Sequence, residues 1–182
     1  PMAEISVVRR YARALFDTAL AHNALDQVEA DLKGVDAVIR STPTLMRALG
    51  APTISTPRKK ELLQQAFGAR VGALTLRFML LSVDRGRYTI LPQVHGEFQR
   101  LANEQRNIQP VEVTAATLLT DDERQRLCDT LARKTGKTID LKVTLDPSLM
   151  GGLIVRMGDT VIDGSVKSRL EQLHARLLTG KV

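Results

Sequence analysis

The most informative stretch of this 182-residue chain is residues 146–170, which read DPSLMGGLIVRMGDTVIDGSVKSRL. Two short segments rich in apolar and β-branched residues predict strands over residues 153–157 and 160–163. Gly158-Asp159 between them has the length and the chemistry of a two-residue hairpin turn. The side-chain oxygens of residues 163–165 can cap a helix that follows the second strand. The stretch therefore predicts one strand–turn–strand–helix unit.

Three motifs link this stretch to the rest of the chain. The first is Gly151-Gly152-Leu153-Ile154-Val155-Arg156, continued by Val161 to Leu170; the second is Arg10-Tyr11-Ala12-Arg13-Ala14-Leu15-Phe16; the third and weaker one is Asp84-Arg85-Gly86-Arg87. In this order, the motifs resemble those of bacterial F-type ATP synthase delta subunits, which are related to the mitochondrial oligomycin sensitivity conferral protein. The resemblance covers nearly the whole chain.

Composition limits the class of protein. The chain is 43% hydrophobic but only 3% aromatic, which predicts a folded protein with an aliphatic core suited to helix packing.

The net charge is +6, which alone suggests an anionic partner such as nucleic acid. However, residues 1–105 carry 14 basic and 10 acidic residues and residues 106–182 carry 12 and 10, so the excess is spread out. A solvated basic surface is the simpler interpretation. We expect no membrane-spanning segment, because no apolar run is long enough.

Hydrophobic periodicity predicts two domains. Residues 1–106 predict a bundle of six helices, and residues 107–182 predict a small α/β domain with a hairpin-containing sheet and a C-terminal helix over one sheet face. Asn23 and Asp26 are expected to cap the second helix, while Thr42-Pro43 and Thr56-Pro57 are expected to start two short ones. In the second domain, Thr120 and Glu123 predict a capping box at the start of a helix. The fold class is thus α followed by α/β.

Two helices of the first domain have an apolar or small-residue stripe beyond the one that a bundle core needs. In the helix predicted over residues 4–21, the second stripe is Val7, Tyr11, Ala14 and Thr18. The helix over residues 71–83 is apolar on two faces. Such a stripe is either buried inside the bundle or presented to a partner, and periodicity leaves both open. The resemblance implies that these helices form a groove for the N-terminal helix of an alpha subunit. The residues assigned to that contact are Tyr11, Ala14, Thr18, Leu76, Met79, Leu80 and Val83.

The resemblance also implies that the second domain binds the C-terminal helices of b subunits in the peripheral stalk. The residues assigned to this contact are Leu153, Val155, Arg156, Ile162, Val166 and Leu170, some of which could equally be core residues.

The sequence contains no recognisable catalytic arrangement. His22, His95 and His174 fall on three different predicted helices, and Cys128 has no neighbouring histidine or second cysteine. Gly151-Gly152 precedes a strand instead of joining a strand to a helix, so it is not a phosphate-binding loop. We therefore expect no metal, no cofactor and no enzymatic activity.

The resemblance implies a non-catalytic stator subunit that holds the alpha/beta head against the b-subunit stalk. Such a protein would lie at the cytoplasmic side of the bacterial cell membrane and associate with it only through the complex. Two alternatives remain, a basic adaptor that binds nucleic acid and, less favoured, a small hydrolase built on the second domain. Binding that weakens steeply with salt would indicate the first, and substrate turnover the second.

Overall fold

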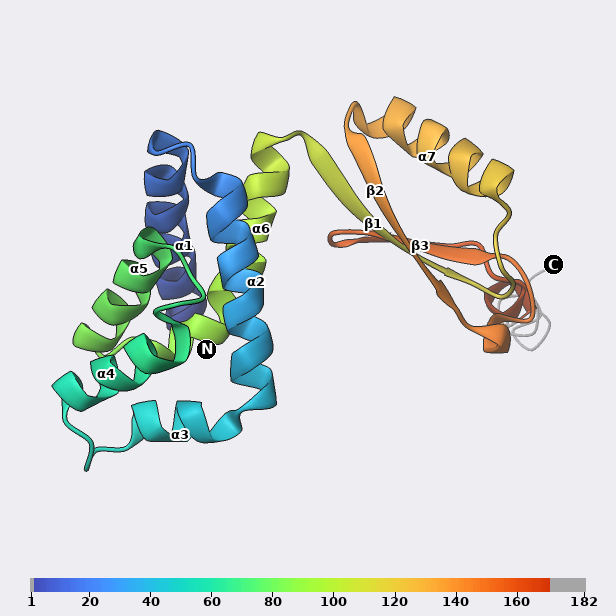
Figure 1. The fold of residues 1–182 in the computed structure, drawn as a ribbon. Helices are drawn as coiled ribbons and strands as arrows, with labels where there is room; N and C mark the ends of the chain where they lie inside the picture. Colours follow the sequence, from blue (N-terminus) through green and yellow to red (C-terminus); the bar gives the residue numbers. More distant parts are fainter. Residues whose placement is uncertain (1, 171–182) are drawn as a thin grey trace. The chain divides into compact units, whose positions relative to one another are not determined.

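The computed structural model describes residues 2–170, and the chain divides into two compact units, Pro1–Ala102 and Asn103–Val182 (Figure 1). The sequence placed the boundary slightly later, between residues 106 and 107. The difference is the last, exposed turn of helix α6, which ends at Gln105 and groups with the second unit. The expected class, a helical part followed by a small α/β part, is confirmed.

The first unit consists of helices joined by short turns. Their bounds are α1 Met2–Ala21, α2 Leu25–Ser41, α3 Pro43–Gly50, α4 Thr56–Phe67, α5 Ala73–Asp84, the 3-10 helix η1 Tyr88–Ile90 and α6 Leu91–Gln105. The core contains apolar residues from every one of these elements. In α1, Val8, Ala12, Leu15 and Ala19 are buried as their spacing predicts, whereas Ile5, expected on the same stripe, is 49% exposed. Phe16 of α1 meets Phe98 of α6 edge to face, with ring centroids 5.7 Å apart.

Two helix ends in this unit use left-handed residues. Gly86 has φ +64°, and the Arg87 N–H donates to the Ser82 carbonyl, which closes α5 with a Schellman motif. Asn23 has φ +51° and plays the same part at the end of α1, where the Ala24 N–H donates to the Ala19 carbonyl.

Two expected helix caps were wrong, and a third was right in position but lacks its hydrogen bond. Asn23 ends α1 and does not cap α2, whose N-cap is Ala24. Ser55, not Thr56, is the N-cap of α4, because the helix begins one residue earlier than Pro57 suggested. Thr42 is the N-cap of α3, but its hydroxyl accepts no capping hydrogen bond. The predicted proline in the first turn is confirmed for both α3 and α4.

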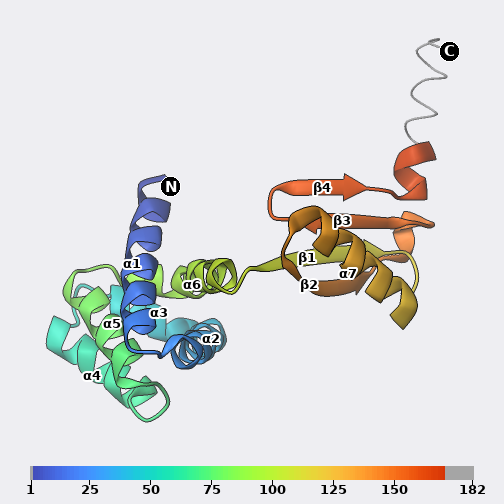
Figure 2. The ribbon, with the colours of Figure 1, turned by 90° about the horizontal axis from the view of Figure 1, so that it is seen from above.

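Helix α5 lies between α1 and α4 in both ribbon views (Figures 1 and 2). Its N-terminus is fixed by α2, since the buried carboxylate of Asp31 accepts hydrogen bonds from the Gly72 N–H and the Thr75 hydroxyl, both at 2.8 Å. The Gln27 side-chain amide donates to the other carboxylate oxygen at 2.8 Å. A buried carboxylate at a helix N-terminus is stabilised by these donors and by the helix dipole.

The second unit is a four-stranded mixed sheet in the order β2-β1-β3-β4. Its elements are β1 Ile108–Ala115, α7 Asp121–Thr135, β2 Thr138–Leu145, the 3-10 helix η2 Pro147–Leu149, β3 Leu153–Met157 and β4 Thr160–Asp163. β1 and β2 are parallel and joined by α7, while β3 is antiparallel to both β1 and β4. The predicted hairpin is confirmed, since Met157 pairs with Thr160 across the Gly158-Asp159 turn.

Helix α7 covers one face of this sheet (Figure 2). Val111 and Val113 of β1, Val155 of β3 and Leu131 of α7 form the buried core of the unit. The predicted capping box is confirmed, because the Thr120 hydroxyl accepts from the Glu123 N–H and the Glu123 carboxylate accepts from the Thr120 N–H.

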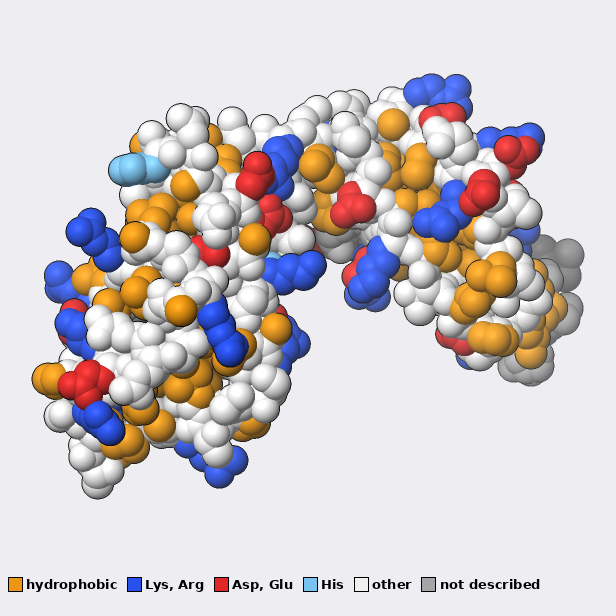
Figure 3. Space-filling model, viewed as in Figure 1, with side chains coloured by type: hydrophobic (Ala, Val, Ile, Leu, Met, Phe, Trp, Pro, Cys, Tyr) orange, Lys and Arg blue, Asp and Glu red, His pale blue; other side chains and the backbone are white. Residues whose placement is uncertain are grey.

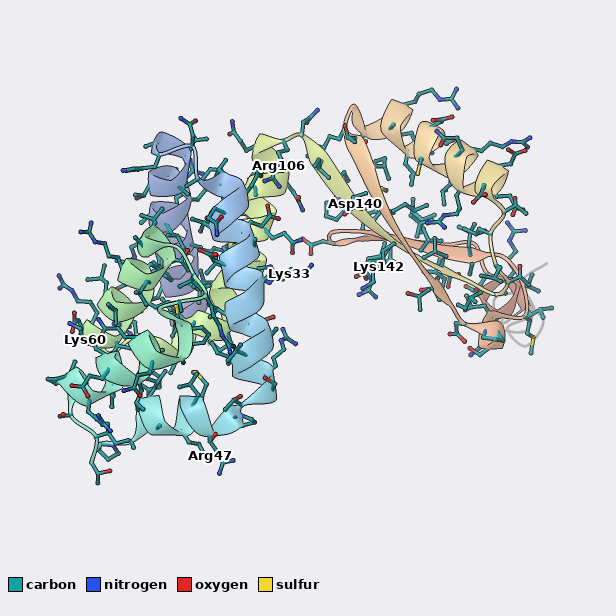
Figure 4. All side chains as sticks on the ribbon, in the orientation of Figure 1. Lys33, Arg47, Lys60, Arg106, Asp140 and Lys142 are labelled. Atoms are coloured by element: carbon teal, nitrogen blue, oxygen red, sulfur yellow. The ribbon has the colours of Figure 1, made fainter. Side chains whose placement is uncertain are left out.

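The other sheet face is charged, since side chains alternate along each strand. Glu112 of β1 stands between its register partners Lys142 of β2 and Arg156 of β3, which places opposite charges on neighbouring strands. Figure 4 labels Lys142 and Asp140 on β2.

A close backbone approach joins η2, β3 and the helix that follows β4. Gly152 has φ +77°, and a Cβ added there would lie 2.3 Å from the Gly164 carbonyl oxygen. Ser165 is the expected cap of the next helix, because its hydroxyl accepts from the Ser168 N–H at 3.2 Å. That helix is described only over residues 166–170, so the predicted cover of a sheet face by its later residues lies outside the described part of the chain.

Candidate functional site

The second stripe of α1 reaches the protein surface. Tyr11 is half-buried, while Ala14 and Thr18 are exposed. The Thr18 hydroxyl donates to the Ala14 carbonyl at 2.7 Å, so this side chain turns its hydroxyl back to its own helix. Val7 is half-buried beside the bundle core. The stripe therefore exposes the Thr18 methyl group, the small Ala14 side chain and part of the Tyr11 ring, none of which is charged.

The α5 residues beside this stripe are identified by an aromatic contact. The rings of Tyr11 and Phe78 meet edge to face, with centroids 6.4 Å apart. Leu74 and Leu81 lie four residues before and three residues after Phe78, so they share its side of the helix. Leu74 is half-buried, and Leu81 is 48% exposed. We name the surface formed by Val7, Tyr11, Ala14, Thr18, Leu74 and Leu81, with the buried Phe78 ring beneath it, the α1/α5 face.

This arrangement corrects part of the alpha-binding assignment. Met79 is fully buried and Val83 is 5% exposed, and both belong to the unit's own core, where a docked helix does not reach. Leu76 and Leu80 are half-buried on the opposite flank of α5, away from Phe78. Since α4 packs against α5, that flank is the one turned toward α4. Leu74, Phe78 and Leu81, whose common stripe is visible in the sequence, are the α5 residues on the side of Tyr11, and none of them was assigned to the contact.

The second unit has its own exposed apolar residues. Among the residues assigned to the b subunit, Ile162 on β4 and Val166 and Leu170 on the following helix are each 41–53% exposed. Two further exposed residues, Met150 and Val161, were not predicted; their side chains are 75% and 52% exposed. Hydrophobic side chains are accordingly visible at the surface of both units, among Lys and Arg side chains (Figure 3).

Three residues assigned to the b subunit lie elsewhere. Val155 is buried in the core of the second unit, and Leu153 packs against that core. Val155 pairs with Ile162 in the β3–β4 ladder, so their side chains share the face that α7 covers. Arg156 is exposed on the opposite, charged face. Val166 and Leu170 lie one turn apart on the helix that follows β4.

The carboxylates with shifted pKa values have structural explanations. The pKa of Asp163 is lowered because its carboxylate accepts from the Ser165 N–H at 2.9 Å and from the Ser165 side chain. Asp146 has a lowered pKa for the same reason, with Ser148 as the donor. The pKa of Glu123 is lowered by the hydrogen bonds of the capping box. All three stabilise turns or helix ends and lie on the surface, so none indicates an acid or base poised for catalysis.

No catalytic chemistry is apparent in residues 5–170. That part of the chain contains no group of three or more His, Cys, Asp and Glu side chains placed to hold a metal ion. His22 contacts the Thr18 carbonyl of its own helix, and Cys128 is a free, half-buried thiol. None of the helices described is both long enough and apolar enough to cross a bilayer. What the geometry offers is two apolar surfaces suited to binding other chains.

Comparison with known proteins identifies the family. A family model described as ATP synthase delta (OSCP) subunit matches residues 7–177. ATP synthase subunit delta of Desulforudis audaxviator is 38% identical over 181 residues and is covered, like this chain, over its full length. The same subunit of Desulforamulus reducens is 40% identical, covering 96% of both chains.

One solved structure shows the same fold. A chain from the Toxoplasma gondii mitochondrial ATP synthase hexamer superposes with a TM-score of 0.67 and 23% identity, covering 94% of this chain and 97% of that one. Together with the family match and the identity to curated delta subunits, these findings show that the chain belongs to the ATP synthase delta (OSCP) subunit family.

Proposed function

We propose that this protein is the non-catalytic stator subunit of a rotary ATP synthase, which holds the alpha/beta head against the peripheral stalk. The observation that carries this proposal is the family match over nearly the whole chain. The two-unit architecture supports it, because each unit has an apolar surface of its own. The family assignment replaces the nucleic-acid-binding and hydrolase alternatives.

The proposed role is mechanical. Torque from the rotor changes the catalytic sites only if the head is held still, so the joint must stay bound through every turnover. Burying a Leu- or Met-sized side chain contributes about 1.5–3 kcal/mol, and association costs several kcal/mol before any net affinity results. A few well-buried apolar side chains at each end of the molecule are therefore what a durable joint requires.

At the first unit, the proposed ligand is the N-terminal helix of an alpha subunit, bound on the α1/α5 face. An amphipathic helix binds such a surface through apolar residues spaced three and four apart. The small Ala14 side chain allows a close approach, and the Tyr11–Phe78 pair provides an apolar centre. Leu74 and Leu81 flank this centre on α5.

At the second unit, the proposed ligands are the C-terminal helices of b subunits. Ile162, Val166 and Leu170 remain the residues assigned to this contact, and exposed Met150 is added because Gly151 after it lies against Val166. Membrane association would follow from the complex, on the cytoplasmic side of the bacterial cell membrane.

Reconstitution of the enzyme tests this function. Membranes stripped of their delta subunit would be assayed for ATP-driven proton pumping before and after the full-length protein is added. We expect the protein to restore pumping without raising ATP hydrolysis by the isolated head. Hydrolysis that stays uncoupled at saturating protein would contradict the stator role. DNA binding that weakens steeply with salt would favour the nucleic-acid alternative instead.

A further inference from the structure

Two arginines occupy equivalent places on the two helices of the α1/α5 face. On α1, Arg10 lies three residues after Val7 and four before Ala14. On α5, Arg77 lies three residues after Leu74 and four before Leu81. Residues three and four apart are neighbours on a helix surface, so each arginine borders the apolar stripe of its own helix on the side away from the bundle core. Both arginines are exposed.

Neither arginine is neutralised within the part of the chain whose side chains are described. Within residues 5–170, no hydrogen bond or ion pair is found for Arg10 or Arg77. The acidic group seven residues after each arginine, two turns along the same helix, is engaged elsewhere. Asp17 pairs with Arg13 at 3.1 Å on α1, and Asp84 pairs with Lys60 of α4 at 2.9 Å. The border of the α1/α5 face therefore has two uncompensated positive charges, one on each helix.

From this charge arrangement we propose that the helix bound on the α1/α5 face is acidic on both flanks of its apolar stripe. This inference rests on the proposed function, because it specifies the chemistry of the partner at that same surface. A helix lying along the face buries its apolar residues over Tyr11 and Phe78. Its side chains on either flank then come within reach of Arg10 on one side and Arg77 on the other. Carboxylates at those positions are the complementary groups, since guanidinium binds carboxylate in a two-pronged geometry.

These two charges are expected to affect selectivity for the partner helix more than affinity for it. An exposed ion pair contributes little, so each arginine is expected to change the dissociation constant only about two- to five-fold. Like charges brought together by the wrong partner weaken binding, and opposite charges speed the encounter. The two arginines would thereby select an acidic amphipathic helix over a neutral or basic one with the same apolar residues.

The test compares three synthetic amphipathic peptides with identical apolar positions. Their flanking positions carry Glu, Gln or Lys, and each is titrated calorimetrically into the full-length protein at low and at high salt. We expect the affinity order Glu, then Gln, then Lys, with a spread of about ten-fold or more at low salt that shrinks at high salt. Equal affinities for the three peptides would overturn the proposal.

Charge variants locate the effect. Arg10→Gln and Arg77→Gln should each reduce the preference for the Glu peptide about two- to five-fold, and the double variant should nearly abolish it. The matched controls are Lys33→Gln on α2 and Arg47→Gln on α3, exposed cations on other helices of the unit (Figure 4), and these should leave the preference unchanged. The proposal is contradicted if all four variants retain the preference for the Glu peptide. It is contradicted as well if the two controls lower this preference as much as Arg10→Gln and Arg77→Gln do, because the net charge of the protein and not this border would then select the peptide.

A fourth probe separates this inference from the proposed function. It is a synthetic peptide of about 25 residues from the N-terminus of a bacterial ATP synthase alpha subunit. If the Glu peptide is preferred but the alpha peptide does not bind, the charge inference stands and the alpha assignment fails. If the alpha peptide binds and its affinity is unchanged when its flanking Asp and Glu become Asn and Gln, the charge inference fails and the assignment stands.

Discussion

The Asp31 carboxylate on α2 accepts a hydrogen bond from the Thr75 hydroxyl on α5 at 2.8 Å, and the two residues are 44 positions apart in sequence. Both side chains are buried, and the same carboxylate oxygen also accepts from the Gly72 N–H. This contact fixes the start of α5 against the bundle. Because α5 supplies half of the α1/α5 face, the position of that face depends on a polar contact beneath it.

Removing the Asp31 carboxylate should therefore destabilise the first unit. Asp31→Ala leaves the buried Thr75 hydroxyl and the part-buried Gly72 N–H without an acceptor, and a buried unsatisfied group costs about 1–3 kcal/mol. Urea denaturation would measure the loss. The control is Asp36→Ala on the same helix, which removes only a surface ion pair with Arg40 and should cost less than about 1 kcal/mol. Equal losses for the two variants would contradict the structural role of Asp31.

Gly152 should tolerate no side chain. Gly152→Ala forces a left-handed alanine and places a methyl group against the Gly164 carbonyl, so we expect destabilisation well above about 1 kcal/mol. Gly34→Ala is the opposite control, since Gly34 lies inside α2 and an added Cβ meets no atom within 4 Å. That substitution should stabilise the protein by about 0.5–1 kcal/mol. Thermal unfolding of both variants would decide whether backbone geometry at Gly152 is the cause.

The two flanks of α5 should differ in partner binding. Leu81→Ser removes an exposed apolar side chain from the α1/α5 face and should weaken an alpha N-terminal peptide about five-fold or more. Leu76→Ser on the flank turned toward α4 should leave that affinity unchanged, provided that circular dichroism shows the variant folded. The reverse pattern in calorimetric titration would restore the assignment of Leu76 and Leu80 to the interface.

Acid should remove the contribution of the α7 capping box. The pKa of Glu123 is lowered in the folded protein, so its carboxylate stabilises the fold above its unfolded pKa, and this contribution is lost as the pH falls through the folded pKa. The difference in unfolding free energy between the protein and its Glu123→Gln variant should then shrink as the pH is lowered from 7 toward 3. In a Thr120→Ala background the hydroxyl donor is absent, so the pH-dependent part should be smaller. A difference that does not vary with pH would exclude a charged cap.

Turns and helix caps could be predicted from the sequence where a single segment determines the local structure. The β3–β4 hairpin depends on Gly158-Asp159, and the α7 cap depends on Thr120 and Glu123, so both were predicted residue by residue. Asn23 was misassigned because the residue suits either a helix start or a left-handed helix end, and the choice depends on where α1 stops.

The sequence could not predict which faces of the helices pack against one another. Helix α5 has apolar residues on most of its circumference, so periodicity could not tell which stripe packs inward, which faces α4 and which lies beside α1. The Tyr11–Phe78 contact settles that question, and only the fold brings those residues together. The same holds for Asp31 and Thr75, where neither residue signals a partner so distant in sequence.

The central claim, that the α1/α5 face binds a helix of another chain, is tested most directly at Ala14. Titration of an alpha N-terminal peptide into Ala14→Asp should show affinity lowered about thirty-fold or more, because a charged carboxylate is brought into the apolar contact and loses its hydration there. Ala37→Asp, at an exposed position of α2, serves as the matched control and should bind like the unaltered protein. Undiminished affinity in a folded Ala14→Asp protein would contradict the account.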